Sequence, residues 1–150
     1  MTSEPAAAPV ILLVEDDPDH TELVRRALEE LAGDTRLVAL ADGEAALDYL
    51  FRRGEWLARE RSPEPELVLL DLRLPRLDGF SVLHEIKAEP TLRHIPVVIL
   101  TSSGSDRDVE RAYAEHANSY LVKPHDYERL LTLVTRARDY WLVRNRRPRR

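Results

Sequence analysis

Hydrophobic positions along the chain gather in five short apolar or β-branched runs that are separated by longer amphipathic stretches. The runs are Val10–Val14, Arg36–Leu40, Leu67–Leu70, Val97–Leu100 and Ser119–Val122. VILLV and LVLL show no polar alternation, which is typical of strands covered on both faces of a parallel sheet. The regular alternation of strand and helix therefore predicts an α/β, doubly wound fold with right-handed crossovers.

The amphipathic stretches carry helix start signals. Asp17 before Pro18 predicts an N-cap followed by proline in the first turn. One apolar stripe runs through Pro18–Leu31 and consists of Leu23, Val24, Ala27, Leu28 and Leu31. Later helices are expected to begin at Asp42-Gly43, at Asp78-Gly79, at Ser105 with Asp108 as a capping box, and at Asp126. The fifth is expected to run to about Leu142, and Arg52–Glu66 to hold the end of the second helix and a long loop.

The pattern predicts one domain over residues 9–143, preceded by a disordered segment 1–8 and followed by a basic tail 144–150. By analogy with common doubly wound sheets, the five strands take the order 2-1-3-4-5, and ligands bind where strands 1 and 3 end. The first of these strands is followed by Glu15-Asp16-Asp17 and the third by Asp71. We therefore expect a cluster of carboxylates at one edge of the sheet.

Such a cluster is suited to a cation, because neighbouring carboxylates repel one another and oxygen ligands with open water positions favour Mg²⁺. Simple helix capping is the alternative reading, and Asp17 fits it. The fourth strand leads to Thr101 and the fifth is followed by Lys123, which add a hydroxyl and a positive charge to the same edge. These groups suit a phosphoryl group. Lysine is rare in this arginine-rich chain, although a surface lysine placed by chance remains the alternative for Lys123.

Charge and composition narrow the functional classes. Residues 1–143 hold 17 basic and 27 acidic side chains, whereas the last seven residues hold five arginines. An acidic body argues against nucleic-acid binding, and a short arginine run is more often a solvated terminus or a contact to an acidic partner. The chain has no cysteine, no signal-peptide pattern at its start and no apolar stretch near the roughly 20 residues of a membrane helix. We expect a cytoplasmic protein without a membrane segment. The sequence contains no glycine-rich phosphate-binding loop, so nucleotide binding is not expected.

The string D-L-R-L-P-R-L-D-G from Asp71 to Gly79 resembles the phosphoacceptor loop of bacterial response-regulator receiver domains. The leading acidic triplet and the spacing from Asp71 to Thr101 and Lys123 also match, and the resemblance covers about residues 9–142. It implies a flavodoxin-like receiver fold in which Asp71 is phosphorylated. It further implies that Asp16 and Asp71 bind Mg²⁺, that Glu15 acts mainly through a metal-bound water, and that the backbone carbonyl of Arg73 is another ligand. Glu15 departs from the family's usual aspartate, which leaves the water-mediated geometry open.

The resemblance also implies roles around the phosphoryl group. Thr101 and Lys123 would contact its oxygens, and Tyr120 would be the switch aromatic that turns inward when Thr101 moves. Arg73 and Ser103 occupy flanking positions that tune hydrolysis in the family. The peptide bond between Lys123 and Pro124 is typically cis there.

The implied partner is a sensor histidine kinase. The stretches D-G-E-A-A-L-D-Y-L-F-R-R-G, I-P-V-V-I-L-T-S-S and Y-W-L resemble stand-alone response regulators of bacterial phytochrome kinases; a kinase of another sensory type is the alternative. Enzymatic activity is not expected beyond weak self-phosphorylation and autodephosphorylation. A phosphatase of the haloacid-dehalogenase type would need a second aspartate where Arg73 stands. A phosphate-independent module usually lacks one of the site residues, and this chain keeps them all.

The fifth helix is apolar over more than one face, with Leu131 and Leu142 lying outside the core stripe. This pattern predicts a homodimer through helix 4, strand 5 and helix 5. The five histidines, His20, His84, His94, His116 and His125, are interpreted as solvated surface. Trp56 is interpreted as a packing or partner-surface residue, and Tyr113 as a packing residue.

Overall fold

The computed structural model describes residues 8–30, 34–58 and 62–148. Most of the segment expected to be disordered, Leu31 of the first apolar stripe and the last two residues of the basic tail lie outside these ranges.

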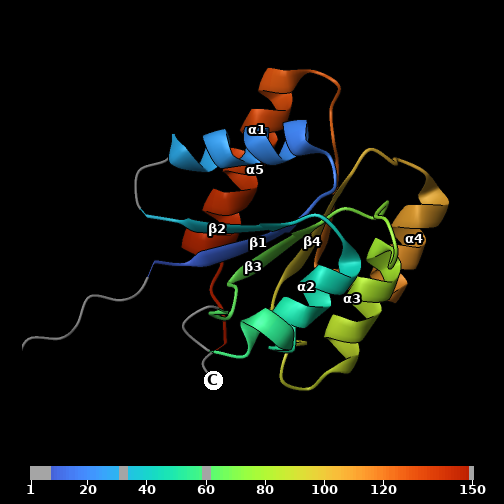
Figure 1. The fold of residues 1–150 in the computed structure, drawn as a ribbon. Coiled ribbons are helices and arrows are strands. Elements are labelled where there is room, and N and C mark those ends of the chain that lie inside the picture. Colours follow the sequence, from blue (N-terminus) through green and yellow to red (C-terminus); the bar gives the residue numbers. More distant parts are fainter. Residues whose placement is uncertain (1–7, 31–33, 59–61, 149–150) are drawn as a thin grey trace, which may run out of the picture.

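Five parallel strands form a single sheet in the described part of the chain (Figure 1). They are β1 (Val10–Val14), β2 (Arg36–Leu40), β3 (Leu67–Leu70), β4 (Val97–Thr101) and β5 (Ser119–Val122). Their order is β2-β1-β3-β4-β5, which confirms the predicted topology. Every residue of β1, β3 and β4 is buried, as their uninterrupted apolar runs indicate. Among the five strands of the described chain, only the end of β4 differs from the prediction, because β4 includes Thr101.

The α-helices begin where the sequence predicts. They are α1 (Pro18–Glu29), α2 (Gly43–Leu50), α3 (Gly79–Ala88), α4 (Asp106–Ala114) and α5 (Tyr127–Asp139). The capping side chains each accept hydrogen bonds from backbone amides two or three residues further on; they belong to Asp17, Asp42, Asp78, Ser105 and Asp126. These bonds satisfy amides that have no partner within the helix.

Two helix ends differ from the prediction. Helix α5 ends at Asp139 rather than near Leu142, and a π-helical turn, Tyr140–Arg144, follows it. There the Asn145 amide donates to the Tyr140 carbonyl at 2.6 Å, which widens the last turn. Helix α2 ends at Leu50, because Arg52 and Gly54 take left-handed backbone conformations (φ 56° and 59°), and a short 3₁₀ turn, Gly54–Trp56, follows.

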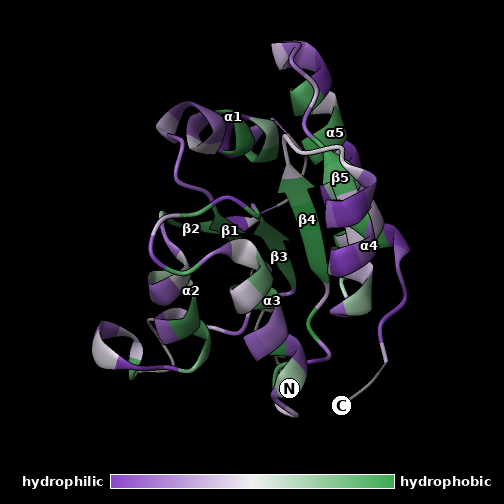
Figure 2. Ribbon diagram, turned by 90° about the vertical axis from the view of Figure 1, so that its right-hand side faces the viewer, coloured by the Kyte–Doolittle hydropathy of each residue, from purple (hydrophilic) through white to green (hydrophobic). Residues whose placement is uncertain are grey.

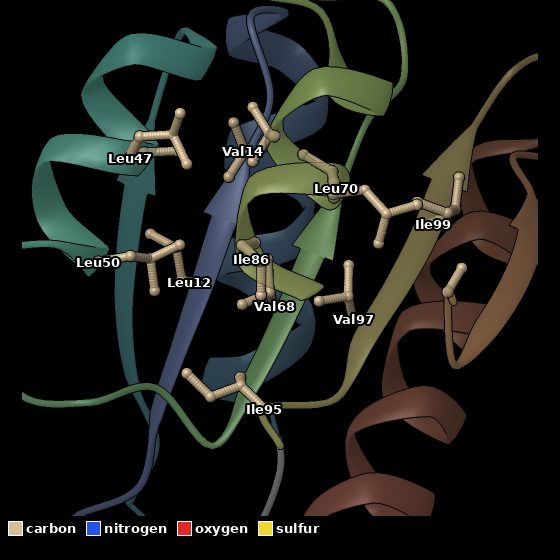
Figure 3. Close-up of a cluster of buried hydrophobic side chains, with 14 of the residues drawn as sticks. Leu12, Val14, Leu47, Leu50, Val68, Leu70, Ile86, Ile95, Val97 and Ile99 are labelled. Carbon is tan, nitrogen blue, oxygen red and sulfur yellow. The ribbon is translucent and has the colours of Figure 1, made fainter. Parts of the chain in front are cut away.

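Helices cover both faces of the sheet: α1 and α5 lie on one, and α2, α3 and α4 on the other (Figure 1). Alternate strand residues serve the two layers. Leu12 and Val14 point into the cluster beneath α2 and α3 (Figure 3), whereas Ile11 and Leu13 pack under α1 and α5. Figure 2 shows apolar (green) strands at the centre, surrounded by helices in which hydrophilic (purple) and hydrophobic (green) residues are mixed. Each fully buried aliphatic side chain stabilises the fold by roughly 1.5–3 kcal/mol.

Several apolar residues of α5 and the turn after it that exceed one core stripe pack inside the molecule. Leu131 and Leu142, expected to lie outside the core, pack against the layer beneath α1 and α5, as do Leu133 and Trp141. For Leu142 the sequence pattern did not show this because the π-helical turn changes the angular position of residues after Asp139. Among the described residues, no helix is both long and apolar enough to cross a membrane.

Candidate functional site

Three carboxylates meet where two neighbouring strands end. Val14 of β1 pairs with Leu70 of β3 in the parallel register, so the residues that follow them emerge side by side. One oxygen each from Glu15, Asp16 and Asp71 lies within 4.8 Å of the others. The predicted convergence of these side chains is confirmed. An open cleft of about 550 Å³ adjoins the cluster, bounded by the β3–α3 loop and by Asp108 and Arg111 of α4.

Lys123 joins two of these carboxylates from the end of β5. Its Nζ lies 2.6 Å from Glu15 Oε1 and 2.9 Å from Asp71 Oδ2. The Lys123 amide donates to the Thr101 carbonyl at 2.7 Å, which fixes the lysine beside the end of β4. Only 8 % of Lys123 is exposed. Water therefore screens these two ion pairs much less than it screens pairs at the surface.

Burial and hydrogen bonding shift the pKa values of Glu15, Asp71 and Lys123. Burial, together with a hydrogen bond to Asp71, raises the pKa of Glu15 to about 8. Burial also acts to raise the pKa of Asp71, but hydrogen bonds from Glu15 and Lys123 outweigh it and lower that pKa. Burial acts to lower the pKa of Lys123, and the two carboxylates outweigh it and raise that pKa. Asp71 is thus held as a carboxylate beside a charged ammonium, as a nucleophile requires.

The carboxylate cluster fits a hard divalent cation. Glu15 Oε2 is buried and has no hydrogen-bond partner among the described residues. A buried carboxylate oxygen in this state is costly unless a ligand occupies the space in front of it. Asp16 is exposed, which leaves one side open for water ligands. The Arg73 amide donates to Asp71 Oδ1 at 3.2 Å, so the backbone of Arg73 lies beside the same carboxylate.

Thr101 and Tyr120 lie on the neighbouring strands. Thr101 is buried, and its hydroxyl has no partner within the described part of the chain. The Tyr120 ring packs against the core layer beneath α2, α3 and α4, and its hydroxyl donates to the Ser103 carbonyl at 2.8 Å. This bond ties β5 to the β4–α4 loop that follows Thr101.

A polar network on that loop was not apparent from the sequence. Ser103 donates to Asp108 Oδ2 at 2.6 Å, and Arg73 Nη2 lies 4.0 Å from the same oxygen. Asp108 therefore connects Arg73 and Ser103, the two residues that the family resemblance places beside the phosphoryl group. Its place three residues after Ser105 indicated only a helix cap.

The interpretation of His20 as solvated surface is wrong. Its Nδ1 lies 2.8 Å from Glu15 Oε1 and 3.0 Å from Lys123 Nζ, and about a third of the side chain is exposed (35 %). The first turn of α1 brings the imidazole back over the end of β1. The other four histidines are exposed, and two of them pair with acids: His84 with Glu115 and His94 with Glu64.

Three further expectations are resolved. The bond between Lys123 and Pro124 is trans rather than cis, which is the isomer that a proline peptide bond intrinsically prefers. Trp56 packs edge-on against Tyr49 with ring centroids 4.9 Å apart, which confirms a packing role. Tyr113, interpreted as a packing residue, is instead half exposed.

A 2-1-3-4-5 parallel sheet with clustered carboxylates, a hydroxyl and a lysine at its carboxyl edge is the arrangement of a receiver domain, a class of signalling domain. Residues 11–135 match the response regulator receiver domain family. The chain belongs to this family.

Relatives match almost the whole chain. The probable methanogenesis regulatory protein FilR2 of Methanothrix harundinacea is 51 % identical over 93 % of this chain and 87 % of its own length. Response regulator Rcp1 of Synechocystis is 43 % identical over 95 % of each chain, and its Mn²⁺-bound structure superposes with a TM-score of 0.87, at 42 % identity over 94 % of this chain and 99 % of that one. The phosphorylated cyanobacterial phytochrome response regulator RcpA gives a TM-score of 0.89 at 37 % identity, over 95 % of this chain and all of that one.

Proposed function

We propose that the chain accepts a phosphoryl group on Asp71 from a phosphohistidine of a sensor histidine kinase, with Mg²⁺ bound beside it. The observation that carries this proposal is the position of Lys123, whose ammonium lies between Glu15 and Asp71 at 2.6 and 2.9 Å. It holds Asp71 ionised and supplies fixed positive charge where a phosphoryl group would arrive.

Each residue of the site has a separate role in the phosphoryl transfer. An Asp71 oxygen forms a bond to phosphorus as the bond from phosphorus to the kinase imidazole breaks, and the electron pair of the broken bond stays on the imidazole. Lys123 and the Thr101 hydroxyl stabilise charge on the transferred oxygens. Asp16, Asp71 and the Arg73 carbonyl would hold the cation, with Glu15 acting through water. When bound, Mg²⁺ neutralises charge that develops on the transferred group.

The signal is a shift between two arrangements of the surface formed by α4, β5 and α5. Thr101 and Lys123 move toward the phosphoryl group, and the β4–α4 loop follows Thr101. Because Tyr120 is hydrogen-bonded to Ser103 on that loop, loop movement is transmitted to β5. Ligands that bind one arrangement better shift the population toward it.

A second copy of the chain is the partner we propose for this surface. Tyr113 of α4, Val122 of β5 and Tyr127 of α5 are 50 %, 45 % and 50 % exposed. We expect the wild type to dimerise in analytical ultracentrifugation when beryllofluoride and Mg²⁺ are added. Val122→Arg should stay monomeric because a charge would be buried, whereas the control Leu57→Arg, at a 74 % exposed position in another part of the chain, should dimerise as the wild type does. A monomeric wild type at high micromolar concentration under all conditions would contradict the proposal.

A bacterial phytochrome kinase is the proposed phosphoryl donor. Support comes from the likeness to RcpA, which is described as a phytochrome response regulator. FilR2, by contrast, is named as a probable regulator of methanogenesis. The test should therefore include histidine kinases of other sensory types beside the phytochrome kinase. Faster phosphotransfer from the phytochrome kinase than from the others is the expected result.

Replacement of Asp71 tests the central proposal. Asp71→Asn should reduce Mg²⁺-dependent labelling from a phosphorylated kinase to background, because an amide is not a nucleophile of comparable strength. The matched control Asp78→Asn keeps an N-cap at α3 and should label as the wild type does. Undiminished labelling of Asp71→Asn would refute the assignment. Partner binding that is the same with and without phosphate would favour the phosphate-independent module.

A further inference from the structure

His20, on helix α1, contacts Glu15, the most buried carboxylate of the acidic cluster. It occupies the first turn of α1, with its Nδ1 2.8 Å from Glu15 Oε1. The same Glu15 oxygen accepts a hydrogen bond from Lys123 at 2.6 Å. Glu15 Oε1 thus has two partners, whereas Glu15 Oε2 has none among the described residues.

The two partners of Glu15 differ in what else they do. Lys123 also binds Asp71, and it is the cation that moves to the phosphoryl group in the function proposed above. His20 lies at the side of Glu15, and its other acidic neighbour, Asp17, has Oδ2 3.7 Å from Nδ1. When Lys123 turns toward the phosphoryl group, His20 is the contact that stays with Glu15 Oε1.

The contacts of Nδ1 change with the position of Lys123. In this structure Nδ1 lies close to both Glu15 Oε1 and Lys123 Nζ, at 2.8 and 3.0 Å. Once Lys123 has turned toward the phosphoryl group, Nδ1 no longer faces an ammonium, and a proton on Nδ1 can be donated to a Glu15 carboxylate that a bound cation keeps ionised. A buried carboxylate that lost both donors would be unpaired, which is costly and leaves its orientation free.

We propose that His20 is a positioning residue of the cation site: it keeps Glu15 oriented toward the cation while Lys123 is engaged by the phosphoryl group. The inference rests on the proposed function. Partners that hydrogen-bond to metal-site carboxylates orient them, and their loss typically weakens metal affinity by about 10–100-fold. In the resting protein Lys123 supplies a second donor, so the effect of losing His20 is smaller there.

The test is the Mn²⁺ affinity of His20→Ala and His20→Asn, measured by electron paramagnetic resonance with and without beryllofluoride. His20→Ala should weaken Mn²⁺ binding about tenfold in the beryllofluoride complex, and by less without it. His20→Asn places an amide donor near the position of Nδ1 and should restore affinity to within about threefold of the wild type. His84→Ala is the matched control, because His84 makes a similar 2.9 Å contact to Glu115 away from the site; its Mn²⁺ affinity should be unchanged.

The outcomes separate the inference from the proposed function. If the wild type binds neither Mn²⁺ nor beryllofluoride, the proposed function fails and the inference fails with it. If the wild type binds both and His20→Ala binds Mn²⁺ equally well in both states, only the inference fails. A lower melting temperature of metal-free His20→Ala with unchanged Mn²⁺ affinity would show a merely structural role and would also overturn it.

Discussion

Gly79 lies directly against the backbone of Asp71. It is the first residue of α3, and its Cα is so close to the backbone of Asp71 and Leu72 that a Cβ would overlap the Asp71 carbonyl oxygen. The glycine therefore allows the helix to start against the end of β3. Backbone atoms are in the way rather than a flexible side chain, so the neighbours cannot yield cheaply.

Replacement of Gly79 should consequently be destabilising. We expect Gly79→Ala to lower the free energy of unfolding by about 1–3 kcal/mol through overpacking, as measured by urea denaturation. Gly104→Ala is a fitting control, since its Cβ would meet only the Val122 methyl groups at an ordinary 3.8 Å. Equal midpoints for wild type and Gly79→Ala would show that the backbone relaxes freely at this position.

Single residues also show how far the sequence could predict the site. Glu15, Asp16, Asp71 and Lys123 follow strand ends, and the parallel sheet brings such positions to one edge whatever the details of packing. His20 was missed because its contact depends on a side-chain rotamer in the first turn of α1, which periodicity does not encode. The same holds for the Ser103–Asp108 contact, which a capping pattern does not indicate.

At the scale of elements, starts were predicted better than ends. Helix starts are marked by side chains that bond to nearby amides, a local signal that is readable from the sequence. The ends of α2 and α4 instead depend on non-glycine residues in left-handed conformations, Arg52 and His116, at φ 56° and 69°. Arginine and histidine rarely adopt this conformation, so neither end could be located in advance.

Lys87 connects three elements at the opposite edge of the sheet from the acidic cluster. Its Nζ, at the end of α3, donates to the carbonyls of Arg93 and Ile95 and to the side chain of Asn118 at 2.8–3.0 Å. Burial lowers the pKa of Lys87 to about 8. The three bonds hold the segment before β4 and the turn before β5 against α3.

Loss of this ammonium should loosen that edge. Lys87→Met keeps the aliphatic stem and removes three donors, and it should lower the free energy of unfolding by about 1–2 kcal/mol at pH 7 in urea denaturation. The relief of burying a charge offsets part of the loss. Arg107→Met, an exposed cation on α4, serves for comparison and should stay within about 0.5 kcal/mol of the wild type. A stable Lys87→Met protein would mean that burial of the charge outweighs its hydrogen bonds.

For the whole molecule, the acidic cluster makes stability depend on pH. The pKa of Glu15 is raised from 4.5 to about 8 in the fold, so between these values the folded state binds more protons than the unfolded state. Stability therefore falls as pH rises through this window. The lowered pKa of Asp71 changes the free energy of unfolding only below about pH 4, and the raised pKa of Lys123 changes it only above about pH 10. Neither group therefore contributes to the pH dependence between pH 4.5 and 8.

Urea denaturation in the presence of a chelator can measure this effect. We expect the free energy of unfolding to drop by on the order of 3 kcal/mol between pH 5 and pH 8, and Glu15→Gln to flatten the slope because an amide does not ionise. Added Mg²⁺ should restore stability at pH 8, since it replaces the missing proton as the partner of the carboxylate. A wild-type slope equal to that of Glu15→Gln would contradict the assignment.

Arg147 pairs with Glu66 at 3.0 Å, just before β3 begins, and β1 begins at Val10 at the same edge. The described chain therefore enters and leaves by the edge of the sheet where the parallel strands start, whereas Asp71 and Lys123 lie where they finish. A dye, a tether or an immobilisation handle attached before Val10 or after Arg147 would therefore leave the described fold at the edge away from the Asp71 carboxylate. The fold thus permits a surface-bound or fluorescent version of the protein in which the approach of a kinase is left unobstructed.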